Sequence, residues 1–262
     1  MPWNAGRAGN TLLVGVLGAA LAGAPGCASK EKVVQGECHQ VYGADVCTWA
    51  TMSGDRVVAF GATIPVKVAE GAPADLPMVW PPRAETTIPL PAQVKTATGF
   101  DNMNVFWEPH GHPPGPYLTP HFDFHFNSVD VSTIDCADTT KPAAIPVGYE
   151  LPDVTFPPPM GVLKGLCVAG MGMHSLLSSE LHGTALFHQT MIVGYYHRVP
   201  VFVEPMVAKT TLMDRKTFSI DIPAVPGTSP AEHYPTKFVA VYDSAAQAYK
   251  FTFSDFAGMG SK

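Results

Sequence analysis

The chain has 262 residues, of which 46% are hydrophobic and only 15% are charged, and its formal net charge is −6. This composition excludes a disordered protein, and the 16 Lys and Arg residues form no cluster of the kind that binds nucleic acid. The 26 prolines and 24 glycines favour turns over long helices, in a chain long enough to bury a full hydrophobic core.

The first residues have the pattern of a signal for export. Arg7 is the only charged residue before Lys30, and residues 11–22 form an apolar stretch that is too short to span a bilayer. The sequence Ala-Pro-Gly-Cys, which ends at Cys27, resembles a bacterial lipobox, in which the cysteine becomes the lipid-modified first residue. Cleavage after Ala22, without lipidation, is the alternative.

This pattern divides the chain into three parts. We predict a lipoprotein-type signal peptide over residues 1–26, a tether over 27–40 and a single β domain over 41–262. The protein is then exported to the bacterial cell envelope and held at a membrane by a lipid on Cys27, or secreted if this cysteine is not lipidated.

Four further cysteines form an even set, which in an exported protein indicates two disulfides. The sequence allows other pairings, and we predict Cys38–Cys47 and Cys136–Cys167. The second bond would join the two ends of a long surface loop over residues 137–159, which contains six prolines.

The rest of the chain consists of short apolar runs separated by Gly and Pro, which is typical of an all-β protein. We predict a single antiparallel β-sandwich or barrel, cupin-like in spirit, with long Pro-rich loops and at most one or two short helices. One helix is predicted over residues 175–181. Strands are predicted at residues 57–65, 77–80, 104–108 and 121–127, and in two hairpins that join 189–197 to 200–207 and 237–242 to 249–253.

Four of the ten histidines lie within residues 110–125. In a strand over 121–127, side chains alternate between two faces, so His121, Asp123 and His125 share one face and three phenylalanines occupy the other. Imidazole and carboxylate bind Zn, Fe, Mn and Cu, which predicts one metal site on this face. Asp123 is either a ligand or the acceptor that orients an imidazole.

Three residues outside this strand complete the predicted ligand set. His112 lies in a loop that glycines and prolines shape, His174 follows Gly-Met-Gly-Met, and Glu204 ends an apolar strand. Asp123 and Glu204 are also the candidates for a general base. A second Glu-Pro dipeptide, at Glu108, also follows an apolar strand, but this similarity is too slight to indicate an internal sequence duplication.

Five of the six remaining histidines are predicted to have structural or exposed positions. His188 lies in a strand-like run and is predicted to pack in the core, and His110 is predicted to be solvent-exposed. His182, His197 and His233 fall in predicted loops or turns.

Residues 107–126 resemble the TTHB-like family of uncharacterised exported bacterial β domains, through Gly-His-Pro and Pro-His-Phe-Asp-Phe-His-Phe. Met-Gly-Met-His at 171–174 and Phe-Val-Glu-Pro-Met at 202–206 match two later family elements. The chain departs from the family pattern in the residues that follow His174. It departs again at Asn127, a position that is usually aromatic in the family. The resemblance implies a shared β fold, supplies no activity, and carries over His112, His121, Asp123, His125, His174 and Glu204.

Three classes of function remain open from the sequence. The first is an envelope protein that binds a transition metal, with Zn favoured and Cu, Fe or Mn as alternatives. The second is a metal-dependent hydrolase, lyase or oxygenase that uses the same residues. The third is a structural or adhesive β domain without a physiological metal. No motif identifies a small-molecule substrate, and the chain is compatible with a homo-oligomer.

Overall fold

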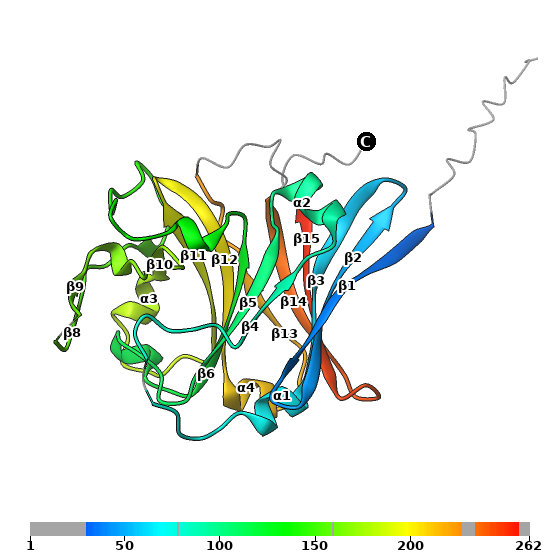
Figure 1. Cartoon of the computed structure of the whole chain (residues 1–262), viewed down its shortest axis with the longest axis horizontal. Coiled ribbons are helices and arrows are strands. Elements are labelled where there is room, and N and C mark those ends of the chain that lie inside the picture. The colour runs from blue at the N-terminus through cyan, green and yellow to red at the C-terminus, as the bar shows by residue number, and fades with distance from the viewer. Residues whose placement is uncertain (1–29, 78, 159, 227–233, 257–262) are drawn as a thin grey trace, which may run out of the picture.

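The computed structural model describes residues 30–77, 79–158, 160–226 and 234–256, and these form an all-β sandwich of two antiparallel sheets (Figure 1). The predicted signal peptide, the lipidation site Cys27 and His233 lie outside the described residues. The first sheet contains β1 (Glu31–Val41), β2 (Ala44–Ser53), β3 (Arg56–Pro65), β15 (Ala248–Phe256), β14 (Pro235–Asp243) and β13 (Phe218–Asp221), in that order.

The second sheet contains seven strands and carries the predicted ligands. Its order is β4 (Thr86–Pro89), β5 (Asn102–Glu108), β6 (His121–Asn127), β12 (Val199–Ala208), β11 (Gln189–Tyr196), β10 (Met173–Leu177) and β7 (Tyr149–Glu150). A separate hairpin of β8 (Val154–Phe156) and β9 (Gly161–Leu163) lies on the side of this sheet that faces away from the first sheet (Figure 1).

The helices of the described residues are short and lie at the ends of strands or in loops. Four are α-helices, which is more than the one or two predicted. They are α1 (Val66–Gly71), α2 (Ala92–Thr98), α3 (Ser178–Leu181) and α4 (Lys209–Met213), and three 3-10 turns are η1 (Gly115–Tyr117), η2 (Val131–Thr133) and η3 (Lys164–Leu166). No helix in this part of the chain is long and apolar enough to cross a membrane.

Aromatic side chains hold the two sheets together. Phe60 of the first sheet lies 5.3 Å from Phe253 in its own sheet and 6.1 Å from Phe126 of β6, measured between ring centroids. Phe124 of β6 similarly meets Phe251 at 5.0 Å. The apolar face predicted for residues 121–127 is therefore the face that packs in the core.

Three predicted elements are wrong in detail. The predicted tether is wrong from Glu31 onward, because these residues form β1, which pairs with β2 along its length. Residues 77 and 79–80 form no strand. The predicted helix over residues 175–181 is a strand up to Leu177 and a helix only from Ser178.

The long loop over residues 137–159 is largely irregular, as predicted, but it also contains β7 and β8. Both predicted disulfides are present. Cys38–Cys47 joins β1 to β2, and Cys136–Cys167 joins the two sides of the loop layer. Two disulfides indicate an oxidising, non-cytoplasmic environment.

We expect Phe60→Ala to lower the free energy of unfolding by about 3–5 kcal/mol, because it empties a buried position where both sheets meet. Urea unfolding followed by circular dichroism measures this change. Val241→Ala is the control, since Val241 lies in the same sheet but is 46% exposed. If Phe60→Ala lowered the free energy of unfolding as little as Val241→Ala, this result would contradict the packing of Phe60 between the two sheets.

Candidate metal centre

Strand β6 is buried on both faces, and one face presents ionisable side chains. All seven of its residues are buried, including His121, Asp123 and His125. Loops, α3 and the β8–β9 hairpin cover this side of the sheet (Figure 1). The polar face predicted from the alternation is therefore present, but it lies beneath a second layer rather than in solvent.

Neighbouring strands bring Glu204 and His174 to the same face. Met206 of β12 pairs with Asp123, and Phe202 pairs with Asn127, so this register sets Glu204 opposite His125. His174 of β10 pairs with Gly194 of β11. Both side chains are buried, with exposed fractions of 1% for Glu204 and 8% for His174.

His112 reaches the same face from the loop between β5 and β6. Gly111, at φ +65°, allows the turn, and a Cβ at this position would lie 2.1 Å from the backbone oxygen of Tyr117. The backbone N–H of His112 donates to that same oxygen at 3.2 Å. A side chain at residue 111 would therefore displace the segment that holds His112.

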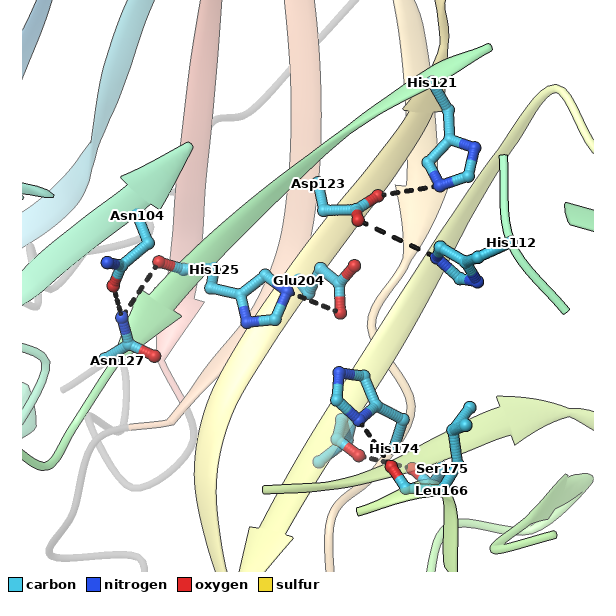
Figure 2. A network of polar contacts seen from close by, with 11 residues as sticks. Asn104, His112, His121, Asp123, His125, Asn127, Leu166, His174, Ser175 and Glu204 are labelled. Atoms are coloured by element: carbon cyan, nitrogen blue, oxygen red, sulfur yellow. Dashed lines mark hydrogen bonds and ion pairs between the residues drawn. The ribbon is translucent and has the colours of Figure 1, made fainter. Parts of the chain in front are cut away.

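All six predicted ligands come together, but they form two groups rather than one. We call the first the loop triad, which consists of His112, His121 and Asp123. We call the second the sheet triad, which consists of His125, His174 and Glu204. Within each triad the ligand atoms lie within 4.8 Å of one another, and Figure 2 shows the two triads next to each other.

The strand geometry explains this division. Four residues of extended strand span roughly 13 Å, which separates His121 from His125. Each of the two histidines instead pairs with the carboxylate nearest to it. His121 Nε2 lies 3.2 Å from Asp123 Oδ1, and His125 Nε2 lies 3.3 Å from Glu204 Oε2.

Backbone carbonyl groups fix the orientation of three of the four imidazoles. A carbonyl oxygen only accepts, so each Nδ1 that contacts one must carry the hydrogen. His112 donates to Pro113 at 2.9 Å, His121 to Thr119 at 2.7 Å, and His174 to Leu166 at 3.0 Å. This arrangement leaves Nε2 as the nitrogen available to a metal, as in known metal sites.

The contact between His121 Nε2 and Asp123 Oδ1 is therefore a contact between two electron-pair donors, which a cation would stabilise. His121 Nε2, Asp123 Oδ1 and Glu204 Oε2 are buried and have no hydrogen-bonding partner among the described residues. Two ligands at 2.0–2.1 Å from a tetrahedral zinc ion lie roughly 3.3 Å apart. The separations of 3.2 and 3.3 Å match this value, whereas His112 Nε2 and Asp123 Oδ2 are 3.9 Å apart.

The next polar residue on this face of β6 shows the contrast. Asn127, where the TTHB-like pattern has an aromatic residue, donates to the side chain of Asn104 (Figure 2). It also donates to the side chain of Asn102 at 3.0 Å. The side-chain amide nitrogen of Asn127 therefore has hydrogen-bonding partners within the protein. On β6, the buried side-chain atoms without a hydrogen-bonding partner therefore belong to residues of the triads and not to Asn127.

His125 lacks a hydrogen-bonding partner at Nδ1, and aromatic packing holds its ring instead. The Phe202 ring stacks on His125 with centroids 4.5 Å apart and also contacts His174 at 5.1 Å. Gly194 makes room for this ring, since a Cβ there would lie 1.8 Å from Phe202 Cε1. The sheet triad therefore depends on a glycine that is not itself a ligand.

Burial and neighbouring charges shift the pKa values of the candidate ligands in different directions. Burial lowers the pKa of His121 to about 4 and that of His174 to about 3, so both rings are neutral at pH 7, the state in which an imidazole can bind a metal. Burial also disfavours charge on His112, but the Asp123 carboxylate outweighs it and raises the pKa to about 9. Burial raises the pKa of Glu204, against the influence of His125.

A pocket of about 610 Å³ opens onto the triads. Five of the six ligands line it, whereas His121 lies behind them. Glu108 also lines this pocket and is a residue that the sequence analysis did not assign. Burial, reinforced by the charge of Asp123, raises its pKa to about 7. Glu108 and Glu204 each precede a proline after an apolar strand, and this similarity was the sequence signal that could have identified Glu108.

The other described histidines lie outside the triads. His110 is exposed, as predicted, and contacts Asp75 at 3.1 Å. His182 and His197 are also exposed, in pairs with Glu150 and Asp138. The prediction that His188 packs in the core is wrong, because it precedes β11 with its side chain exposed while its neighbour Phe187 is buried.

We expect His174→Asn to change how the stability of the metal-free protein depends on pH. Wild-type His174 is neutral when folded but protonates at about pH 6.5 when unfolded, so its contribution is lost as the pH falls from 6.5 toward 3. Wild type should therefore lose stability relative to the variant by roughly 1 kcal/mol per pH unit between pH 6.5 and 5.

Urea unfolding in the presence of a chelator, at pH 5 and pH 7, measures this difference. His182→Asn is the control, because it removes an imidazole from an exposed pair with Glu150. If the free energies of unfolding of wild type and His174→Asn changed in parallel with pH, this result would contradict the buried, neutral state of His174.

Comparison with protein-family models, with curated proteins and with solved structures finds no match to this chain. Membership of the TTHB-like family stays a prediction. What the protein does is inferred from the residues of the two triads and the pocket above them.

Proposed function

We propose that this chain is a metal-binding protein that holds two divalent transition-metal ions, one in each triad. Zinc is the favoured metal, because each triad offers two imidazoles and one carboxylate with ligand separations that suit tetrahedral coordination. Iron, manganese and copper bind the same ligand types and are the alternatives.

One observation carries the proposal. His121 Nε2 faces Asp123 Oδ1 at 3.2 Å, and the Nδ1–H of the same ring is already donated to Thr119. Two buried electron-pair donors in contact destabilise the fold unless a cation lies between them or a proton moves onto one of them. A bound metal ion satisfies both atoms at once. In the sheet triad no carbonyl group fixes the tautomer of His125, so the support there is the buried carboxylate of Glu204, whose Oε2 has no hydrogen-bonding partner among the described residues.

The proposed setting is the bacterial cell envelope. The export signal and the lipobox-like segment at Cys27 support an exported protein with a lipid anchor, and two disulfides agree with an oxidising compartment. Incorporation of a radiolabelled fatty acid in wild type but not in Cys27→Ala tests the anchor. Label in neither protein would favour cleavage after Ala22.

A metal-dependent enzyme is the second candidate, and the pocket favours it. Each triad supplies three protein ligands, which is the number that catalytic zinc sites use while keeping a position open. The pocket gives a small molecule access to both triads and contains Glu108, a carboxylate outside them. A screen for ester, carbonate and oxygenase chemistry tests this candidate, with His125→Ala protein as the control for activity that depends on the centre.

We expect protein purified without a histidine tag to bind about two equivalents of metal per chain, one in each triad. His121→Ala should remove the ion of the loop triad, and His125→Ala should remove that of the sheet triad. Each variant should then retain about one equivalent, and the double variant almost none. Elemental analysis after dialysis measures the content.

His182→Ala is the matched control, because His182 also faces a carboxylate, Glu150 at 2.9 Å, but in an exposed pair. It should leave the metal content unchanged. Full metal content in the double variant would place the ions elsewhere. Absence of metal from wild type after reconstitution would favour the structural or adhesive domain.

A further inference from the structure

The pocket above the triads combines a polar floor with apolar walls. The floor consists of the ligands that line it, and the walls include Met160, Met171, Leu176 and Ile192. Its volume of about 610 Å³ falls in the range of sites that enclose small organic molecules. Metal ions in the triads do not fill a cavity of this size, so its apolar walls indicate a further ligand with an apolar part.

The rim of the pocket also keeps apolar surface in solvent. Trp80 is 37% exposed and Val79 is 46% exposed, although both line the pocket. The Trp80 ring lies 5.4 Å from that of Phe156, so it is held against the far wall. Exposed large apolar side chains grouped at a pocket mouth are typical of a binding site.

The charge of a loaded floor is positive. Asp123 and Glu204 contribute −2 with the imidazoles neutral, and two divalent ions contribute +4, which gives +2. The other charged residues of the lining are Arg83, which adds one positive charge, and Glu85 and Glu108, which subtract at most two. The pocket then keeps a charge of at least +1, so an anionic group is favoured at its floor and an apolar group along its walls.

Resting on the proposed function, we propose that this pocket binds a small monocarboxylate with an apolar body, of the size of a medium-chain fatty acid. The carboxylate contacts the metal ions of the triads, and the apolar body lies against Met160, Met171 and Trp80. This assignment names the ligand class of the centre, whether the protein stores that ligand, carries it or transforms it.

The experiment measures separately how the carboxylate and the apolar body contribute to binding. Protein reconstituted with Co²⁺ is titrated with octanoate, acetate and octanamide, and binding is followed by visible absorption of the cobalt and by calorimetry. Octanoate should change the cobalt spectrum and bind at least roughly fifty-fold more tightly than acetate, since each buried methylene contributes about fourfold. Octanamide, which lacks the charge, should bind weakly and leave the spectrum unchanged.

A variant of the wall tests the apolar part. Trp80→Ala should weaken octanoate binding by roughly tenfold, in keeping with the loss of a large apolar contact. It should leave acetate binding and the cobalt spectrum unchanged, because Trp80 belongs to neither triad. Val199→Ala is the control, since Val199 is 53% exposed and lies outside the pocket.

The two proposals fail in different ways. A normal cobalt spectrum together with equal affinities for octanoate and acetate overturns the ligand assignment and leaves the metal centre standing. Octanamide that binds as tightly as octanoate overturns the role of the carboxylate. If Co²⁺ gives no protein-bound spectrum, the metal centre itself fails, and the ligand assignment falls with it.

Discussion

The structure depends on a strand that is buried on both sides. One face of β6 supplies Phe122, Phe124 and Phe126 to the core between the sheets, and the other places two imidazoles and a carboxylate beneath the loop layer. The aromatic face fixes the strand rigidly, because its rings interlock with those of the first sheet. The polar face must then accept a desolvation cost that only compensating charge can offset.

The elements around β6 convert this constraint into a defined site. Carbonyl oxygens from the segment between β5 and β6 and from η3 hold three rings with Nε2 directed inward. Phe202 holds the fourth ring by stacking, in the space that Gly194 leaves open. The ligands are thus oriented by residues that do not bind metal, and substitutions at Gly111 or Gly194 would disturb the centre as surely as loss of a ligand.

Much of this arrangement follows from the sequence, and the exceptions have physical reasons. Alternation over residues 121–127 predicted the bounds of β6 correctly, because a shift of one residue would move the phenylalanines out of the core and put the ionisable side chains there. The β1 strand was missed because it lies at the sheet edge with mostly exposed side chains, so it carries no apolar pattern. Ser-Leu-Leu at 175–177 was assigned to a helix because short apolar runs fit both structures.

The division into two triads could be foreseen only in part. The sequence predicted one site because His121 and His125 share a face of the strand, whereas the roughly 13 Å between them separates them. The partner of each depends on the cross-strand register. His174 and Glu204 were identified from local sequence alone. Their joining with His125 rests on the order β6-β12-β11-β10, which no local pattern encodes.

The disulfide between Cys136 and Cys167 bears on the order of events during maturation. Cys167 directly follows Leu166, whose carbonyl oxygen sets the tautomer of His174. An oxidised chain therefore presents this imidazole already aligned, whereas a reduced chain must first order that segment. If the proposed ions bind, thiol oxidation and metal acquisition are thereby coupled, because closure of the Cys136–Cys167 disulfide prepares the sheet triad.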